Sequence, residues 1–190
     1  LLPVRFASAA MGGFLRIMAP LTPWHSRALR NLNHAMPDLD DAEKDQILRA
    51  MWHNLGRVVG EYPHINSIVD KGWVEFVGLD HLKALDGGGF LIGAHIGNWE
   101  FGPFAALLTG KKVAAIYRPL NNPLLSGLLH RRQETYSGDI YRKGREAALG
   151  MVSALRKGQM MCLLVDQQLR EGISVPFFGH PARTSISHIK

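Results

Sequence analysis

The chain has 190 residues, of which 46% are hydrophobic and 20% charged, which is a globular composition and the length of one domain. Its 22 lysines and arginines outnumber 16 acidic residues, and the net charge of +6 favours an anionic partner such as phospholipid headgroups, an acidic carrier protein or nucleic acid. The single cysteine, Cys162, excludes a disulfide framework, and its apolar surroundings predict a buried, inert thiol.

The first 24 residues are apolar but are interrupted by prolines and arginines. Their longest apolar run, residues 6–15, is about half of the roughly 18 residues that a membrane-spanning helix needs. We therefore interpret residues 1–37 as a membrane-proximal segment that contacts an interface rather than crossing it.

A helix is predicted over residues 41–61. Asp40 precedes Glu43 by three residues, which is the spacing of a capping box. Apolar residues then recur at helical spacing until Pro63 ends the pattern. The apolar stripe is expected to pack on the rest of the domain.

The rest of the chain alternates apolar runs with helical patterns. Strands are predicted over residues 73–77, 90–94, 113–117 and 160–165, and helices over residues 99–108, 123–136 and 145–157. This order predicts an α/β fold with a largely parallel or mixed sheet flanked by helices. We interpret residues 1–190 as a single domain whose catalytic α/β part spans residues 38–185.

Polar residues follow the strand predicted at residues 90–94. His95 comes directly after it, and Glu100 lies in the first turn of the next predicted helix. Ligands of α/β sheets bind at the carboxyl ends of the strands. If the loop through Gly97 folds back, the Glu100 carboxylate can meet the His95 imidazole, which would then be a general base with a fixed tautomer.

The spacing alone somewhat favours a non-catalytic interpretation, in which His95 is a structural histidine and Glu100 is an ordinary acidic residue in the first turn of a helix. A metal site fits less well, because there is no His-Glu-x-x-His motif and no paired cysteine. The Gly-x-Gly-x-x-Gly motif of dinucleotide sites and the Gly-x-Ser-x-Gly motif of serine hydrolases are also absent.

His95 and Glu100 form the His-x4-acidic motif of the glycerolipid and lysophospholipid acyltransferase superfamily. The sequence of residues 93–100 resembles that of the branch whose members add lauroyl and myristoyl groups in bacterial lipid A biosynthesis. Further resemblance is carried by residues 30–32, 36–37, 51–57, 117–119, 166–167, 175–179 and 181–182. It covers roughly residues 27–184, so a glycerolipid acyltransferase-like fold is expected. Residues 186–190 do not match, and we expect a chain truncated at its C-terminus.

The resemblance implies an O-acyltransferase of lipid A, and hence lipopolysaccharide, biosynthesis. Such an enzyme moves a fatty acyl group from the thioester of acyl carrier protein to a hydroxyl of a lipid A precursor or related glycolipid. His95 is then the general base, Glu100 holds it, and amide donors near the helix start stabilise the oxyanion. No metal or redox cofactor is implied.

Four other residues are expected to bind substrate. Arg118 follows the strand over residues 113–117 and would hold a phosphate of the acceptor. Asp166 is a family motif position that would orient Arg118 or help to close the site. Asn98 belongs to the His95 loop, and Arg145 precedes a helix where it would meet phosphate or the carrier protein. The apolar segment 175–179 would line the acyl pocket, touch the bilayer or pack under the sheet.

Two other functions stay open. The same site could activate water and act as an acyl thioesterase, or the chain could be a non-catalytic remnant that binds carrier protein or membrane. Nucleic-acid binding is not expected, because no recognised motif accompanies the positive charge. The resemblance implies the cytoplasmic face of an inner membrane, held peripherally or by the N-terminal segment.

Overall fold

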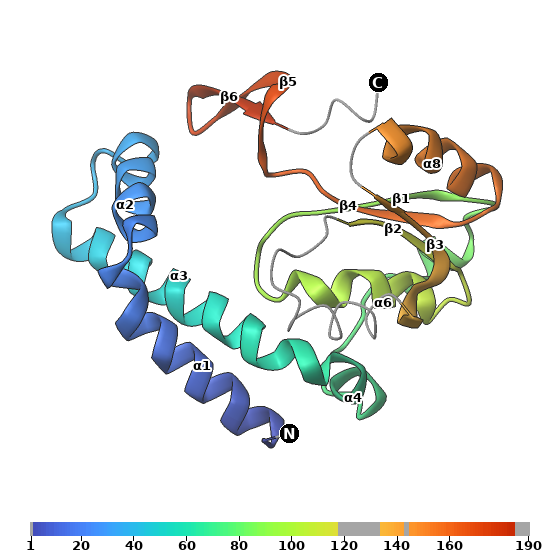
Figure 1. The fold of residues 1–190 in the computed structure, drawn as a ribbon, viewed down its shortest axis with the longest axis horizontal. Helices are drawn as coiled ribbons and strands as arrows, with labels where there is room; N and C mark the ends of the chain where they lie inside the picture. The colour runs from blue at the N-terminus through green and yellow to red at the C-terminus, as the bar shows by residue number, and fades with distance from the viewer. Residues whose placement is uncertain (1, 118–133, 143–144, 185–190) are drawn as a thin grey trace. The chain divides into compact units, whose positions relative to one another are not determined.

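The computed structural model describes residues 2–117, 134–142 and 145–184 (Figure 1). These residues form two compact units. The helical unit contains the described residues up to 67 and those from 168 onward, and the sheet unit contains the described residues between 68 and 167.

The N-terminal part of the helical unit is entirely helical. Its elements are α1 (Val4–Met18), the 3-10 turn η1 (Ala19–Leu21), α2 (Pro23–Ala35), α3 (Asp41–Glu61) and the 3-10 turn η2 (Tyr62–His64), and α4 (Ile65–Asp70) follows at the boundary between the units. The predicted helix over residues 41–61 and its capping box are confirmed. The Asp40 side chain accepts from the Glu43 N–H at 2.8 Å, and the Glu43 side chain accepts from the Asp40 N–H at 2.9 Å.

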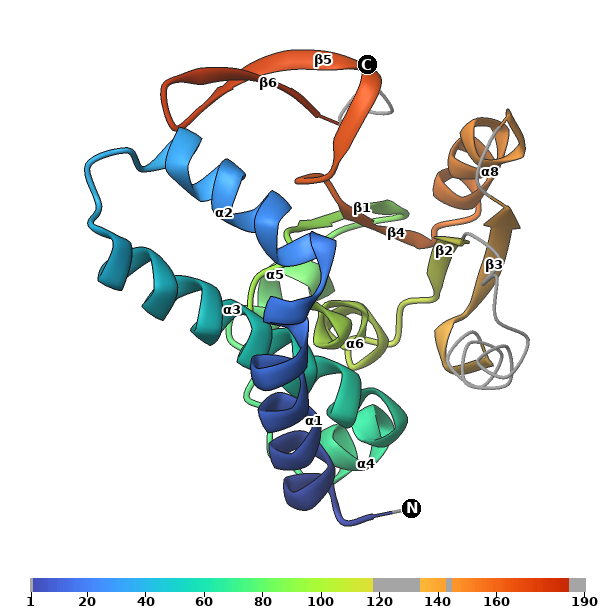
Figure 2. The ribbon, with the colours of Figure 1, turned by 60° about the vertical axis from the view of Figure 1, so that its left-hand side comes forward.

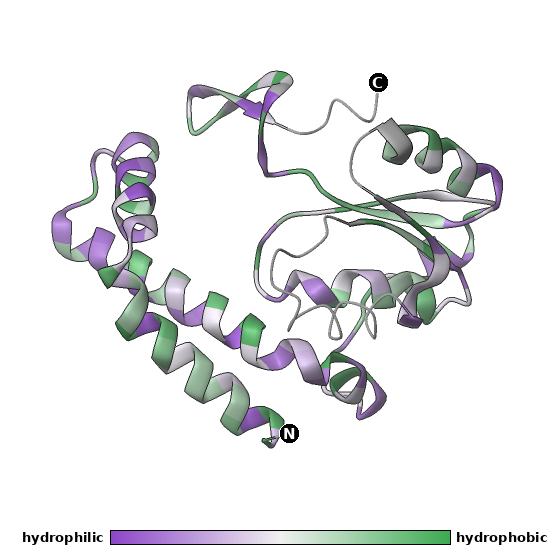
Figure 3. Ribbon diagram, in the orientation of Figure 1, coloured by the Kyte–Doolittle hydropathy of each residue, from purple (hydrophilic) through white to green (hydrophobic). Residues whose placement is uncertain are grey.

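Helices α1 and α3 pack closely because glycines line their contact. A Cβ at Gly56 would collide with the Met11 carbonyl oxygen, and one at Gly60 would collide with that of Ala7. The Ser8 hydroxyl, also in this contact, donates to Glu61 Oε1 at 2.7 Å. The exposed side chains of α1 include those of Phe6, Phe14 and Ile17. Much of the α1 ribbon has the green of hydrophobic residues in Figure 3. No helix in the described ranges is both long and apolar enough to cross a bilayer.

The apolar stripe of α3 is only partly covered. Leu48 and Val58 are buried, as the pattern predicted, whereas Ile47, Met51 and Val59 stay exposed. The prediction that the whole stripe packs on the domain is therefore confirmed for only part of it.

The C-terminal part of the helical unit is an antiparallel hairpin that the sequence patterns did not predict. It consists of β5 (Gln168–Phe177) and β6 (His180–Thr184). Phe177 pairs with His180, so Phe178 and Gly179 form a two-residue turn, with φ of 49° and 74°. Positive φ at both positions is the type I′ geometry of tight hairpins. The apolar segment 175–179 is thus the tip of a hairpin whose two phenylalanine rings are exposed.

The sheet unit is an α/β fold with a parallel sheet, as predicted (Figure 2). In chain order its elements are α5 (Leu79–Lys83), β1 (Gly89–Gly93), the 3-10 turn η3 (Trp99–Phe101), α6 (Gly102–Leu107), β2 (Val113–Tyr117), β3 (Ser137–Arg142), α8 (Arg145–Arg156) and β4 (Met160–Leu164). The strand order is β1-β4-β2-β3, and every pair is parallel. The last strand in sequence thus lies between the first two.

Helices cover both faces of this sheet because successive strand residues point to opposite sides. On one face Ala114 and Met161 pack with Met151 and Ala154 of α8. On the other face Val113 and Met160 pack with Ala106 of α6, and Cys162, expected to be buried, is partly buried at the margin of this cluster. α8 and α6 accordingly lie on opposite sides of the sheet in Figure 1.

One prediction for this unit was wrong, and one strand was not predicted. Residues 73–77 form no strand, since among the described residues no strand pairs with them and Val77 is 88% exposed. Strand β3 was not predicted, because Ser-Gly-Asp-Ile-Tyr-Arg is largely polar and shows no apolar run. The predicted helix over residues 123–136 falls mostly outside the described residues.

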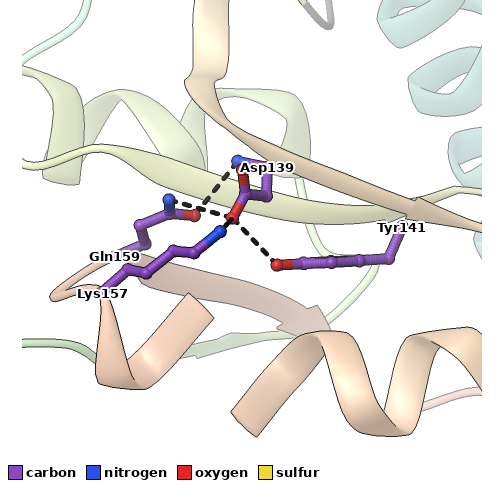
Figure 4. A network of polar contacts seen from close by, with 4 residues as sticks. All are labelled: Asp139, Tyr141, Lys157 and Gln159. Carbon is purple, nitrogen blue, oxygen red and sulfur yellow. Dashed lines mark hydrogen bonds and ion pairs between the residues drawn. The ribbon is translucent and has the colours of Figure 1, made fainter. Parts of the chain in front are cut away.

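A polar network ties β3 to the turn between α8 and β4 (Figure 4). The Asp139 carboxylate accepts from Lys157 Nζ at 2.7 Å, from the Tyr141 hydroxyl at 3.0 Å and from Gln159 Nε2 at 3.3 Å. The hydrogen bond from Lys157, followed by that from Tyr141, lowers the pKa of Asp139. These contacts hold β3, which pairs with β2 alone among the strands that the structure describes.

Candidate active site

The site is built at the carboxyl ends of β1 and β4, which are neighbours in the sheet. Gly93 at the end of β1 is in register with Leu164 at the end of β4, and the Val165 N–H donates to the Gly93 carbonyl at 3.1 Å. The segments that follow β1 and β4 therefore leave the sheet side by side. His95 and Asp166 are therefore brought together although 71 positions separate them.

The Asp166 carboxylate holds His95 by two hydrogen bonds. Its Oδ1 lies 2.7 Å from Nδ1 of the ring, and its Oδ2 accepts from the His95 backbone N–H, also at 2.7 Å. Partial burial acts to raise the pKa of Asp166, but the hydrogen bonds from the backbone and ring of His95 outweigh it and the pKa is lowered. The carboxylate is thus ionised at neutral pH. Because it can only accept, the hydrogen bond comes from an N–H at Nδ1 of the His95 ring.

This pairing fixes which nitrogen of the ring can act as a base. With the proton of the neutral imidazole on Nδ1, the lone pair is on Nε2. The Gln167 side-chain amide nitrogen lies 3.4 Å from Nε2. The His95 side chain is 30% exposed, so the ring is partly open to solvent.

A tight loop after β1 places His95. Gly97 has φ of 59°, a conformation that glycine adopts without strain, and the Ile96 N–H donates to the Ala94 carbonyl at 2.8 Å. Asn98 then starts η3, because its side-chain oxygen accepts from the Glu100 N–H at 3.2 Å. The Trp99 ring meets His95 edge-on, with ring centroids 4.9 Å apart.

The other predicted site residues are placed as follows. Glu100 is half-buried in η3, at the start of the helical segment as expected. The carboxylate on His95 Nδ1 is nevertheless that of Asp166, for which the resemblance predicts a role in orienting Arg118 or in closing the site. A pairing of Glu100 with His95 stays a prediction. Arg118 lies outside the described residues, and Arg145 is described only as the first residue of α8.

Gln167 had not been singled out for the site. In the sequence it stands out only as the residue after Asp166 in a motif of the family, because a glutamine after a strand does not by itself indicate a chemical role. The order β1-β4 is what brings it to His95. Within the described ranges, no three histidine, cysteine, aspartate or glutamate side chains converge as ligands for a metal ion.

The protein thus has a parallel α/β sheet with a histidine and a carboxylate paired at the carboxyl ends of its strands. This arrangement is typical of acid–base catalysts. The chain belongs to the bacterial lipid A biosynthesis acyltransferase family, whose model matches residues 1–189. It is 29% identical over 160 residues to the lipid A biosynthesis acyltransferase of Haemophilus influenzae, an alignment that covers 81% of this chain and 50% of that protein. The chain thus spans about half the length of the curated relative that it matches.

Proposed function

We propose that this chain belongs to an enzyme that transfers a fatty acyl group from an acyl carrier protein thioester to a hydroxyl of a lipid A precursor or related glycolipid. The observation that carries the proposal is the 2.7 Å contact between His95 Nδ1 and the Asp166 carboxylate, in a chain of the acyltransferase family. Because this contact engages Nδ1, Nε2 is the ring nitrogen that can take a proton.

In the proposed reaction the acceptor hydroxyl gives its proton to His95 Nε2 while its oxygen bonds to the thioester carbonyl carbon. The carbonyl π electrons move to oxygen and form a tetrahedral oxyanion. When the carbonyl re-forms, the carbon–sulfur bond breaks and the thiolate takes the proton back from His95. The products are an ester and the free carrier thiol. Asp166 keeps the ring oriented and stabilises the transient imidazolium through both steps.

The remaining predicted residues keep their proposed roles. Glu100 completes the His-x4-acidic motif beside the base. Arg118 and Arg145 would bind phosphate of the acceptor or acidic groups of the carrier protein. Asn98 would contact the substrate from the His95 loop, and it also fixes the start of η3, because its side-chain oxygen accepts from the Glu100 N–H. No metal or redox cofactor enters this scheme.

We further propose that α1 brings the enzyme to the cytoplasmic face of the inner membrane. Phe6 and Ile17 on its exposed face are 70% and 71% exposed, and Phe14 is 53% exposed. Arg5 and Arg16 are exposed on the same helix. An apolar face bordered by cations suits the interface of an anionic bilayer, where the helix lies in the plane.

The test of the transfer reaction uses radiolabelled acyl carrier protein and a tetra-acylated lipid A precursor. The 190-residue chain and a version joined to the part of the Haemophilus influenzae relative that the alignment does not cover are assayed side by side. Labelled lipid that disappears with His95→Ala, and not with the exposed control His81→Ala on α5, supports the proposal. Absence of labelled lipid from both versions, when both are folded, refutes it.

The same assay separates a thioesterase from a transferase. The His95–Asp166 pair would activate water as readily as a hydroxyl, so free fatty acid is measured with and without the lipid acceptor. Equal release of fatty acid in both conditions, with no labelled lipid, would identify a thioesterase instead.

The membrane proposal is tested by flotation with phosphatidylglycerol vesicles. The double variant Phe6→Ser with Ile17→Ser should bind several-fold less protein than the wild type, because it removes apolar area from the exposed face. The control Ala9→Ser changes the same exposed helix without removing a large apolar side chain. Equal binding by all three proteins would exclude α1 as the membrane contact.

A further inference from the structure

Gln167 contacts the nitrogen of His95 that acts as the base in the proposed reaction. Its amide nitrogen is 3.4 Å from Nε2, while Asp166 occupies Nδ1 at 2.7 Å. Because the proton of the neutral ring is on Nδ1, Nε2 can only accept, and the group of Gln167 that faces it must be the N–H donor. The two residues after β4 therefore hold opposite sides of one imidazole.

The acceptor hydroxyl must come to the same position. A general base takes a proton across about 2.6–3.2 Å, so the attacking oxygen and the Gln167 amide compete for Nε2. At 3.4 Å the amide contact is longer than an ordinary N–H hydrogen bond and correspondingly weak. Gln167 is also exposed, so its side chain can turn aside when the hydroxyl binds.

We propose that Gln167 is a further catalytic residue, in an inference that rests on the transfer reaction proposed above. Displaced from Nε2 by the acceptor hydroxyl, its side-chain amide donates a hydrogen bond to the thioester carbonyl oxygen as that oxygen becomes an oxyanion. The bonds made and broken are those already described, and Gln167 gives up no proton in the step.

The chemistry of the tetrahedral adduct places the oxyanion within reach of this amide. The attacking oxygen and the oxyanion are bonded to the same carbon, and the attacking oxygen is hydrogen-bonded to Nε2. A donor that starts beside Nε2 needs to move by only about one hydrogen-bond length to meet an oxyanion, which is best stabilised at about 2.7–3.1 Å.

A nearby alternative donor is already engaged. Backbone N–H groups at the start of the helical segment were expected to stabilise the oxyanion, but the Glu100 N–H donates to the Asn98 side chain. The Glu100 N–H would have to give up this bond before it could meet the oxyanion. The Gln167 amide loses its partner without a further change, because the acceptor hydroxyl takes its place at His95 Nε2.

The test compares Gln167→Met with Gln168→Met, the same change one residue along the chain, in the version of the enzyme that transfers acyl groups. Loss of one oxyanion donor should lower kcat by about 10²–10³-fold and leave KM for the lipid acceptor within a few-fold. Gln168→Met should keep kcat close to the wild-type value. Thermal unfolding of each variant checks that the exposed substitutions leave the fold intact.

Gln167→Glu supplies a second readout. A carboxylate beside Nε2 would favour a protonated His95, so the acidic limb of the pH–rate profile should move to higher pH. A carboxylate cannot donate, so the plateau rate at high pH should also stay far below that of the wild type. If the acidic limb of the Gln167→Glu profile shifts but its plateau at high pH reaches the wild-type rate, the oxyanion role is contradicted.

The outcomes separate the inference from the proposed function. Retention of kcat within about threefold by Gln167→Met, or a loss confined to KM, would overturn the inference while transfer by the wild type upholds the function. Absence of transfer by the wild type would overturn both.

Discussion

Replacing Asp166 by asparagine removes the charge and one acceptor while keeping the shape. Asp166 accepts from two N–H groups of His95, one on the ring and one on the backbone, each at 2.7 Å. Asparagine has a single acceptor oxygen. If that oxygen keeps the backbone N–H, the asparagine NH₂ faces Nδ1, and the ring must carry its proton on Nε2 instead. In that tautomer Nε2 is no longer a base.

The expected loss in kcat for Asp166→Asn is about 10²–10⁴-fold, the range for a misplaced tautomer and a lost general base. The free energy of unfolding should fall by only about 1 kcal/mol, since one hydrogen bond is lost and the Asp166 side chain is 34% exposed to solvent. Activity should therefore fall far more than stability.

Both quantities are measured, by acyl transfer and by thermal unfolding, in a cycle with His95→Ala. Residues that act as one unit are not additive, so Asp166→Asn should have little further effect once His95 is gone. Retention of more than about a tenth of wild-type kcat by Asp166→Asn would refute the reasoning. An equally large loss in the His95→Ala background would refute it too.

Three further predictions concern stability. Phe178→Asn should raise the free energy of unfolding by about 0.5–1 kcal/mol, because asparagine tolerates the φ of 49° better than phenylalanine; Phe177→Asn should not, and denaturant unfolding compares them. Gly56→Ala should cost about 1–3 kcal/mol through collision with α1, whereas Gly13→Ala, with open space around its Cβ position, should be neutral or stabilising in the same titrations. Because the folded-state pKa of Asp139 is lowered, its contribution to stability should be present above the pKa of an ordinary aspartate, about 3.9, and be lost as pH falls through the lower folded value. Unfolding measured against pH should show the wild type and Asp139→Asn converging there, and a gap that persists in acid would contradict this reasoning.

Local signals were enough for the elements that carry their own boundaries. The capping residue Asp40 and the stripe through Leu48 defined α3, because both depend only on neighbours along one helix. Apolar runs defined β2 and most of β1 and β4, since strands buried between two layers of helices are apolar throughout. Gly158, with φ of 72°, lies just past the end of α8, in the left-handed conformation that often follows a helix C-terminus.

The failures have the opposite cause. Residues 73–77 alternate like a strand, but a strand exists only with a partner, and none is present among the described residues. β3 is polar, yet it pairs with β2 and is held by the Asp139 network. The hairpin tip at Phe178 lacks the asparagine that normally signals a type I′ turn.

The sequence alone therefore determined the fold class, the loop that carries His95 and the resemblance to an acyltransferase family, because these depend on residues close together in the chain. Tertiary structure decided the chemical partners of His95. β4 enters the sheet beside β1, and this strand order places Asp166 and Gln167 on the two ring nitrogens. Spacing along the chain pointed to Glu100, but it cannot measure proximity between strands that are distant in sequence.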